Sequence, residues 1–303
     1  MINGIIVINK EKGYTSHDVV ARLRGILHTK KIGHTGTLDP MAEGVLPICI
    51  GGATKLCDTF TGHDKEYEAV MLLGSTYDTL DVTGQLLETR EVMSTTEEIE
   101  AALKSFIGGY DQIPPMYSAR KINGKKLYDL ARSGITVERT PVFVNIYDIS
   151  VLSIDLPRVR IKVKCGKGTY IRSLIDDAGK KLGCGAAMEA LTRTKSGDFT
   201  LEGAHTLSDI EEAAKNDKIS DVIIILDEVF SDLPAYEPSG DLVKFVRNGN
   251  VLPGRKVRDA MSGKRPKEGD RIRVYDATGK LCGIYEYKIA GDIFKPYKMF
   301  LGP

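Results

Sequence analysis

The residues with the clearest potential for chemistry surround one carboxylate. Residues 33–51 read GHTGTLDPMAEGVLPICIG, and Asp39 lies in the middle of this run. The proline that follows Asp39 disfavours helical backbone there, and the glycines of the run permit positive φ angles or a close approach to a ligand. A carboxylate on such a loop can act as a nucleophile or stabilise positive charge on a sugar, as the acids of glycosidases do. Because Asp-Pro also begins ordinary turns, the loop alone fits both a reactive site and a plain turn.

The composition is that of a globular protein of about two domains. The chain has 303 residues, of which 42% are hydrophobic and 27% charged, values that are usual for globular chains. No apolar stretch approaches the ~20 residues that a membrane span needs, and the first residues lack the basic region of a signal peptide, so we expect a cytoplasmic protein without membrane contact. The five cysteines are scattered without a Cys-x-x-Cys pair, which predicts reduced thiols and neither a disulfide nor a zinc site.

Positive charge is concentrated toward the end of the sequence. The formal net charge is only +1, yet residues 244–273 contain ten Lys or Arg against three Asp or Glu. Such an asymmetry favours a surface that contacts phosphate, although a solvated charged face gives the same pattern. The sequence has no dinucleotide fingerprint, P-loop or cluster of metal-ligating residues, so we expect neither a cofactor nor a metal.

The elements that position the Asp39 loop can be predicted from the apolar pattern. Apolar residues at helical spacing predict helices at residues 16–27 and 170–182, with Ser16 as the N-cap of the first. Short apolar or β-branched runs predict strands at residues 5–8, 45–50, 67–73, 142–154 and 159–165. Strands and helices are interleaved without a regular βαβ rhythm, which predicts an α+β fold on a mixed, largely antiparallel sheet.

A domain boundary is predicted at residues 231–240, where Pro and Gly cluster. Before it, residues 184–232 are predicted to be a helical portion of the first domain. Beyond it, glycines separate short β-type runs, which indicates a small β-rich domain. The sequence therefore predicts a first domain over residues 1–232 and a second over residues 233–303.

Several blocks of the sequence resemble, in the same order, the TruB family of tRNA pseudouridine synthases. They are NKEKG (9–13), the Asp39 loop, KEYEA (65–69), LGSTYDTLDVTG (73–84), IPPMYSARKINGKKLYDLAR (113–132), KGTYIRSLIDDAGKKLGCGA (167–186) and LTRTKSGDF (191–199). The resemblance implies a catalytic domain of the pseudouridine synthase type over residues 1–232, with an RNA-clamping insertion at about 113–140. It implies a PUA-like RNA-binding domain for residues 233–303, where the match is looser.

The reaction implied by this family is isomerisation of uridine 55 in the T loop of tRNA. The N1 to C1′ glycosidic bond breaks, the base turns, and C5 bonds to C1′, with no external group and no cofactor. Because C1′ and C5 are inaccessible in stacked RNA, the target nucleotide must be extruded, at a cost of a few kcal/mol.

The resemblance assigns catalytic roles to three residues. Asp39 matches the catalytic aspartate, and Arg172 matches an arginine that pairs with it and holds the carboxylate ionised. Tyr67 matches an active-site tyrosine whose ring stacks on the target uracil, while its hydroxyl is a poor base at neutral pH. Three roles for Asp39 stay open at this point: attack on C1′, attack on C6 of the base, and abstraction of a ribose proton.

Five further residues are matched to substrate binding. Leu191 would pack against the same base, and His34 would occupy the space that the extruded nucleotide leaves in the RNA stack. Lys10, Lys55 and Lys121 would supply phosphate-binding charge, the last of them from the insertion. The expected partner is thus the T stem-loop of tRNA, bound by a monomer without an obligate protein partner.

Three other functions fit parts of the same pattern. The first is a guide-RNA-dependent pseudouridine synthase, which the lack of long basic extensions disfavours. The second is a non-catalytic RNA-binding protein or tRNA-folding chaperone, since RNA binding does not require catalysis. The third is a glycosidase of free nucleosides, against which the basic insertion and the positive segment at residues 244–273 argue.

Overall fold

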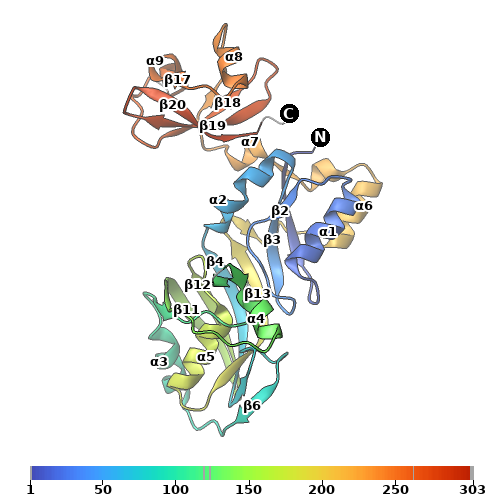
Figure 1. Cartoon of the computed structure of the whole chain (residues 1–303), viewed down its shortest axis with the longest axis vertical. Helices are drawn as coiled ribbons and strands as arrows, with labels where there is room; N and C mark the ends of the chain where they lie inside the picture. Colours follow the sequence, from blue (N-terminus) through green and yellow to red (C-terminus); the bar gives the residue numbers. More distant parts are fainter. Residues whose placement is uncertain (1, 119, 123, 262, 301–303) are drawn as a thin grey trace.

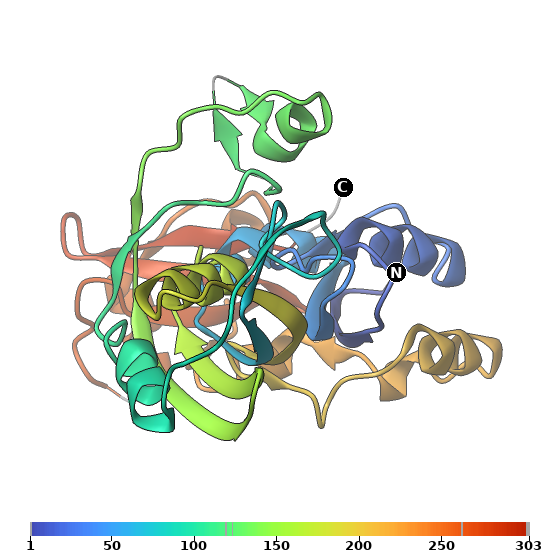
Figure 2. The ribbon, with the colours of Figure 1, turned by 90° about the horizontal axis from the view of Figure 1, so that it is seen from below.

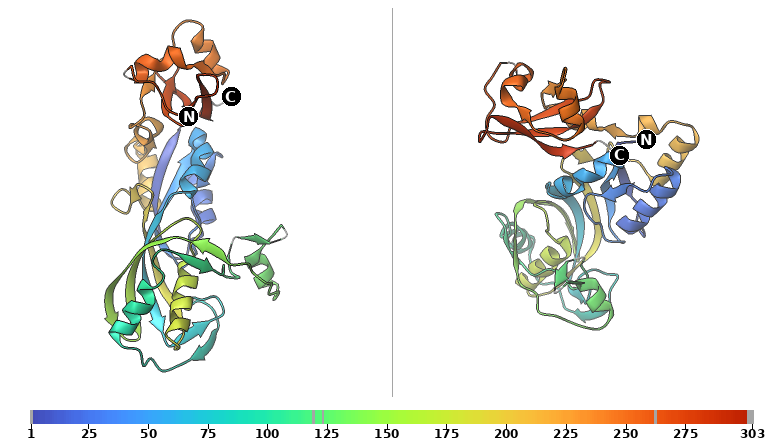
Figure 3. Two further views of the ribbon diagram at one scale, coloured as in Figure 1. Left: turned by 90° about the vertical axis from the view of Figure 1, so that its left-hand side faces the viewer. Right: turned by 45° about the horizontal axis from the view of Figure 1, so that its top comes forward.

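A computed structural model gives the fold, and it describes residues 2–118, 120–122, 124–261 and 263–300. The molecule is elongated, with a small β-rich unit at one end of a larger α+β body (Figure 1). A slender insertion projects from the side of the body (Figures 2 and 3). In the described residues, no helix has the length and apolar character that crossing a membrane requires.

A nine-stranded mixed sheet forms the centre of the body in the described part of the chain. Its main order is β11 (Ile146–Asp155), β12 (Arg158–Cys165), β4 (Lys65–Leu73), β13 (Ala186–Ser196), β3 (Glu43–Ile50), β1 (Gly4–Lys10) and β15 (Ile224–Ile225), with β2 (Ile32–His34) paired to β3 and β14 (Phe199–Thr200) paired to β13. These neighbours run antiparallel except β13 and β3, which run parallel over a short stretch. The predicted α+β fold on a mixed, largely antiparallel sheet is confirmed.

Strand β4 shows how the sheet turns one face toward the core. Every second residue of the strand is buried, and the residues between them are half-buried. Because successive side chains of a strand point to opposite faces, Tyr67 and Met71 share one face. They belong to the main core together with Ile171 and Leu174 of α5 (Ile171–Lys181), the helix predicted at residues 170–182. This face of the sheet therefore carries both the core and the start of α5.

Helix α1 (Ser16–Ile26) is tied to the loop that carries Asp39. The prediction of Ser16 as its N-cap is wrong, because Thr15 is the cap: its hydroxyl accepts a hydrogen bond from Asp18 N at 3.0 Å, and the Asp18 carboxylate accepts one from Thr15 N at 2.8 Å. This reciprocal pair is a capping box with aspartate at the third helical position. Ser16 is fully buried inside the first turn, and its hydroxyl accepts a hydrogen bond from Leu38 N at 2.9 Å.

The prediction of a helical portion over residues 184–232 is wrong at its start. Residues 186–196 form β13, which lies between β4 and β3 in the sheet. Their sequence, AAMEALTRTKS, is rich in residues that favour helices, but pairing with strands on both sides overrides this local preference. The rest of the segment carries β14, α6 (Leu207–Lys215), η2 (Ile219–Asp221), β15 and α7 (Leu226–Val229).

Two hairpins and several short helices complete the body. The segment between β7 (Tyr110–Gln112) and β10 (Val142–Val144) is the insertion of Figures 2 and 3, and the two strands pair at its base. It carries a hairpin of β8 (Lys121–Ile122) and β9 (Lys125–Lys126), followed by α4 (Leu127–Arg132). The other elements are the hairpin of β5 (Ser75–Tyr77) and β6 (Leu86–Thr89), η1 (Gly51–Leu56), α2 (Cys57–Thr61) and α3 (Thr96–Lys104).

The C-terminal unit has its own five-stranded sheet within the described residues. Its order is β16 (Ala235–Tyr236), β18 (Arg271–Tyr275), β19 (Leu281–Lys288), β20 (Ile293–Met299) and β17 (Leu252–Pro253), accompanied by α8 (Leu242–Arg247), α9 (Gly254–Val257) and η3 (Arg258–Met261). Ile272, Tyr285 and Phe294 are fully buried in a core whose members all come from this unit. The C-terminal residues are thus β-rich and enclose an apolar core of their own.

A further apolar cluster crosses the junction between the body and the C-terminal unit. We call it the junction cluster; its buried members are Ile5, Val7, Val45, Cys49, Ala53, Leu56, Phe60, Leu226, Tyr275, Leu281, Ile284 and Phe300. Beside it, the Lys55 ammonium donates a hydrogen bond to the Met299 carbonyl at 2.8 Å. The C-terminal unit is therefore packed onto the body by buried side chains as well as joined to it by the chain.

Candidate active site

A cavity of about 500 Å³ lies where the Asp39 loop, β4, β13 and the start of α5 meet. Its wall contains four of the predicted site residues: Asp39, Tyr67, Arg172 and Leu191. They are far apart in the sequence, and the adjacency of β4, β13 and β3 in the sheet brings them together. The volume lies within the range of small-ligand sites, about 300–1,000 Å³. We call this cavity the Asp39 pocket.

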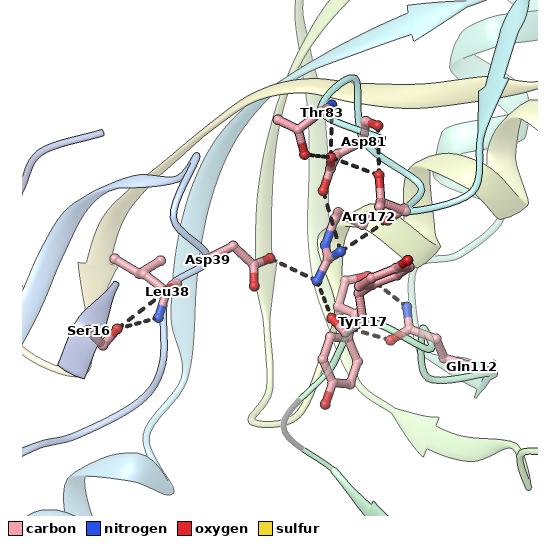
Figure 4. A network of polar contacts seen from close by, with 10 residues as sticks. Ser16, Leu38, Asp39, Asp81, Thr83, Gln112, Tyr117 and Arg172 are labelled. Atoms are coloured by element: carbon pink, nitrogen blue, oxygen red, sulfur yellow. Dashed lines mark hydrogen bonds and ion pairs between the residues drawn. The ribbon is translucent and has the colours of Figure 1, made fainter. Parts of the chain in front are cut away.

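Arg172 contacts both carboxylates of the site. Its side chain is 5% exposed, and its guanidinium donates to Asp39 Oδ2 at 3.0 Å, to the Tyr117 carbonyl at 2.8 Å and to the Thr79 carbonyl at 3.0 Å (Figure 4). Oδ2 of Asp81 lies at 3.4 Å as a fourth acceptor. A guanidinium stays protonated at all physiological pH values and presents its donors in a planar fork. These four contacts hold a permanent positive charge beside Asp39.

Asp81 is a second carboxylate on Arg172 that sequence analysis did not single out. Its side chain is 6% exposed, and it accepts hydrogen bonds from the Thr79 hydroxyl at 2.9 Å, from Thr83 N at 3.0 Å and from the Thr83 hydroxyl. Arg172 therefore bridges a buried carboxylate and that of Asp39, whose side chain is 36% exposed. A signal was present in the sequence: threonines two residues to either side of an aspartate favour a turn closed by its carboxylate.

The loop that carries Asp39 is fixed on both sides. Leu38 N donates to the Ser16 hydroxyl of α1 (Figure 4). Gly44 has a φ of +102°, and a Cβ added there would lie 2.3 Å from the Arg193 carbonyl oxygen. Only glycine allows the loop and β13 to approach this closely. The loop is thus held between α1 and β13, with Asp39 at the pocket wall.

The surroundings of Asp39 shift its protonation equilibrium. Burial raises the pKa of the Asp39 carboxyl; the charge of Arg172 opposes this shift, Asp81 adds to it and Lys10 opposes it, so that the pKa is raised overall. A carboxyl in a cleft whose pKa is perturbed by burial and by a specific charged partner is typical of a functional site. The ionised form, with Arg172 at 3.0 Å, can serve as a nucleophile or as a base.

Tyr67 and Leu191 give the pocket an apolar surface. They lie on the neighbouring strands β4 and β13 and are 8% and 7% exposed. Burial raises the pKa of the Tyr67 hydroxyl above its ordinary value, so the phenol is neutral at neutral pH. Its ring and the Leu191 side chain are suited to contact with the flat face of a base.

Lys10 does not line the pocket, and its place in the structure differs from its predicted role. The side chain is fully buried, and its ammonium donates to the carbonyls of Tyr14 at 2.6 Å, Glu11 at 3.1 Å and Pro40 at 3.4 Å. Burial lowers the pKa of Lys10 to about 8. The prediction that Lys10 binds RNA phosphate is contradicted, because a side chain without exposed surface cannot contact phosphate. Lys10 instead fastens the backbone next to Asp39.

Arg193 and Lys65 also line the pocket, and the sequence analysis missed both. Arg193 is 1% exposed and donates to the carbonyls of Val45 at 2.7 Å and Gly36 at 3.2 Å. Lys65 is 7% exposed and donates to two carbonyls of the turn before β4, at 2.6 and 2.7 Å. Burial, aided by the charge of Arg193, lowers the pKa of Lys65 to about 8. Together with Arg172, these buried cations make the electrostatic potential of the pocket more positive, which favours a negatively charged ligand without direct contact to it.

Gln112 holds the start of α5, where Arg172 lies. It is 1% exposed, and its amide donates to the Tyr170 carbonyl at 3.0 Å and accepts from Tyr170 N at 2.8 Å (Figure 4). Tyr170 is the N-cap residue of α5 and lines the pocket. Neither residue was singled out from the sequence. The insertion and three strands, β10, β11 and β12, lie between Gln112 and Tyr170 in the sequence, so no local pattern predicts this contact.

The remaining predicted substrate-binding residues lie outside the pocket wall. His34 is in β2, where its Nδ1 accepts a hydrogen bond from Gly36 N at 3.3 Å, and burial lowers the pKa of His34 to about 4. Lys55 is bound to Met299 beside the junction cluster, and the side chain of Lys121 lies outside the described residues. In the described part of the chain, no group of three His, Cys, Asp or Glu side chains is placed to hold a metal ion.

Two family models match the body. The TruB family pseudouridylate synthase N-terminal domain matches residues 24–171, and the tRNA pseudouridylate synthase B C-terminal domain matches residues 172–233. The chain belongs to the TruB family. The resemblance seen in the sequence blocks is therefore confirmed, and Asp39, Tyr67, Arg172 and Leu191 all fall within the matched residues of this family.

Relatives within the TruB family align over the whole chain. A tRNA pseudouridine synthase B of Lachnoclostridium phytofermentans is 48% identical, over 99% of this chain and 100% of the relative. That of Bacillus subtilis is 40% identical, over 99% of this chain and 98% of the relative. A solved structure of an H/ACA RNP bound to a substrate RNA containing 2′-deoxyuridine aligns with a TM-score of 0.70 at 26% identity, over 99% of this chain and 85% of that one. A Cbf5-Nop10-Gar1 complex gives 0.70 at 28% identity, over 98% and 85%.

Proposed function

We propose that this TruB-family protein isomerises uridine 55 in the T loop of tRNA to pseudouridine. One observation carries the proposal: the pocket places the Asp39 carboxylate 3.0 Å from the Arg172 guanidinium, in a wall shared with Tyr67 and Leu191. This set offers a nucleophile, a fixed cation for it and an apolar surface for a base. Full-length relatives named tRNA pseudouridine synthase B support tRNA as the substrate.

The reaction keeps every heavy atom of the nucleotide. The N1 to C1′ bond breaks, the base turns, and a C5 to C1′ bond forms while C5 loses a proton and N1 gains one. Asp39 acts as the nucleophile, at C1′ or at C6, or as the base that removes a ribose proton. In each route Arg172 stabilises the ionised carboxylate, and the ring of Tyr67 stacks on the uracil. All bonds change within one nucleotide, so the residues of the pocket need no transferred group.

The RNA contacts extend the proposal beyond the pocket. His34 fills the gap that the extruded nucleotide leaves, as a neutral imidazole because of its lowered pKa. Lys55 and Lys121 supply charge for phosphate, and residues 233–303 serve as a PUA-like RNA-binding domain. The insertion at residues 113–140 makes a further contact with the RNA. We propose that the protein works as a cytoplasmic monomer without an obligate protein partner.

A guide-RNA-dependent activity is the second candidate. The observation that favours it is the likeness to solved H/ACA RNP and Cbf5 structures, at 26% and 28% identity. The relatives named tRNA pseudouridine synthase B are closer in sequence, at 40% and 48% identity, which favours tRNA. Pseudouridine mapping in unmodified tRNA, treated with the purified protein alone, separates the two. Product at position 55 without a guide RNA or a second protein supports the first candidate.

The Asp39→Asn protein tests the central role of this residue. We expect it to lose pseudouridine formation by at least about 10³-fold, the scale seen when an essential group is removed, while tRNA binding is retained. Asp111→Asn is the matched control, because Asp111 is exposed on β7 and does not line the pocket. An active Asp39→Asn protein, or one that loses binding in proportion to activity, contradicts the role given to Asp39. Product from free uridine supports the glycosidase instead.

A further inference from the structure

The wall of the Asp39 pocket contains a hydroxyl with no hydrogen-bond partner. In the described residues, buried side-chain oxygen or nitrogen atoms without a partner are Ser118 Oγ and the Tyr285 hydroxyl. Tyr285 belongs to the core of the C-terminal unit, whereas Ser118 is 5% exposed and lines the Asp39 pocket. A buried hydroxyl without a partner lowers the stability of the fold. At the wall of a ligand pocket, the missing partner is expected from the ligand.

The backbone around Ser118 fixes its place. Ser118 N donates to the Met116 carbonyl at 2.9 Å, and the Ser118 carbonyl accepts from Tyr128 N at 3.1 Å. The preceding residue, Tyr117, accepts a hydrogen bond from Arg172 through its carbonyl at 2.8 Å. Ser118 is therefore held next to the guanidinium that binds Asp39, while its buried hydroxyl has no partner among the described residues.

Several other polar side chains of the pocket are already engaged within the protein. Asp39 and Arg172 bind one another, and Arg193 and Lys65 donate to backbone carbonyls. An extruded uracil brings two carbonyl oxygens and a ring N–H, which lose any partners they had in the RNA. A serine hydroxyl can donate one hydrogen bond and accept others. The Ser118 hydroxyl can therefore form a hydrogen bond with one of these polar groups of the base inside the pocket.

We propose that the Ser118 hydroxyl donates a hydrogen bond to a carbonyl oxygen of the extruded uracil. The inference deepens the proposed function and rests on it. Oγ is screened from solvent in the structure, so the contact includes a rotation about χ1 of Ser118 from one staggered position to another. Ser118 is thus a substrate-contacting residue that orients the base.

The symmetry of uracil explains how one donor can serve substrate and product. To replace N1 by C5 at the sugar, the ring turns about the axis through N3 and C6. That turn also exchanges the C2 and C4 carbonyl groups. A donor beside the N3 edge therefore meets a carbonyl oxygen before and after the turn. Ser118 would hold the ring in its plane in both states, which keeps C5 aligned with C1′.

Ser118→Ala and Tyr285→Phe form a matched pair of variants. Each removes a buried hydroxyl that has no partner in the described residues, so neither should lower Tm. We expect Ser118→Ala to reduce kcat/KM on unmodified tRNA by about 3- to 10-fold, the range of one neutral hydrogen bond, and Tyr285→Phe to keep the wild-type value. With 2-thiouridine or 4-thiouridine at the target position, the difference between wild type and Ser118→Ala should shrink, since sulfur accepts hydrogen bonds weakly.

The outcomes separate this inference from the function on which it rests. A Ser118→Ala protein with the wild-type kcat/KM overturns the inference while leaving the function in place. A clear drop in Tm of Ser118→Ala also overturns it, because the hydroxyl would then have a structural partner. If the wild-type protein forms no pseudouridine in tRNA, the proposed function fails and the inference falls with it.

Discussion

Replacing Arg172 by lysine tests the centre of the site. The guanidinium serves four acceptors: the carboxylates of Asp39 and Asp81 at 3.0 and 3.4 Å, and the carbonyls of Tyr117 and Thr79 at 2.8 and 3.0 Å. Lysine keeps the charge but has three donors on one nitrogen, so Arg172→Lys leaves at least one acceptor unserved. Loss of the charge-assisted bond to Asp39 is worth about 1.5–3 kcal/mol, which corresponds to a rate lower by about 10- to 100-fold.

The assay follows from the chemistry of the reaction. Formation of the C5 to C1′ bond releases the hydrogen on C5, so tritium placed there in tRNA appears in water as product forms. We expect Arg172→Lys to slow the single-turnover release by about 10- to 100-fold with tRNA affinity near that of wild type. Its Tm should also fall, because the buried Asp81 loses part of its pairing.

A matched control is available on the surface of the body. Arg158 pairs with Glu189 through two hydrogen bonds, at 2.7 and 2.8 Å, and is exposed. An exposed ion pair contributes about 1 kcal/mol or less, so Arg158→Lys should leave both the rate and the Tm near wild type. If Arg172→Lys also keeps the wild-type rate, the geometry of the guanidinium does not organise Asp39 and the reasoning is refuted.

Protonation and backbone geometry give three more expectations. Because the pKa of Asp39 is raised by burial above 3.8, kcat/KM should fall with decreasing pH at a higher pH than an ordinary aspartate would give, and an acid limb at or below 3.8 contradicts this. Burial lowers the pKa of His34 from 6.5 to about 4, so the unfolded state binds a proton at this histidine more tightly than the folded state does. Folding stability should therefore be lost as the pH falls from about 6.5 to about 4. His34→Gln should show a smaller drop in Tm over this pH range, and a drop equal to that of wild type argues against the role of His34. Gly44→Ala should lower the free energy of unfolding in urea by about 3 kcal/mol or more, because Gly44 has a φ of +102° and an added Cβ would clash with the Arg193 backbone. Gly25→Ala, in open space on α1, should instead raise the free energy of unfolding by about 0.5 kcal/mol. Equal effects of the two substitutions would refute the steric argument.

The sequence predicted the members of the site whose motifs are continuous. Asp39, Tyr67, Arg172 and Leu191 each lie in a block with its own pattern, and the sheet brings these blocks to one pocket. Several of the missed residues, among them Asp81, Gln112 and Arg193, have at least one partner that is remote in the chain. The contact between Asp81 and Arg172 joins the loop after β5 to the first turn of α5. Such a pairing depends on how the elements pack against one another, and the local periodicity of the sequence does not predict it.

Local rules also failed where tertiary structure outweighed them. The helix-favouring composition of residues 186–196 gave way to a central strand, because β4 and β3 both offered partners. The run at 142–154 predicted one strand, but it divides into β10 and β11, which join different sheets. Lys10 looked like a surface cation, yet the carbonyls of Glu11, Tyr14 and Pro40 accept hydrogen bonds from its buried ammonium. In each case at least one of the contacts comes from a segment remote in the chain, which for Lys10 is Pro40.

The junction cluster has a consequence for how the C-terminal unit can be studied. A chain shortened at residue 232 would uncover the body's share of this cluster, including Ile5, Val45 and Leu56, which are fully buried in the whole protein. Exposed apolar surface of this kind promotes aggregation. A deletion would therefore confuse lost affinity for tRNA with lost solubility. Charge reversals on the exposed lysines and arginines of residues 244–267 change the electrostatics of the unit while the junction cluster stays buried, and so can measure the contribution of this unit to RNA affinity. Arg271 and Arg273 are best left unchanged, because Arg271 pairs with Glu286 and Arg273 donates to the Asp227 carbonyl of the body.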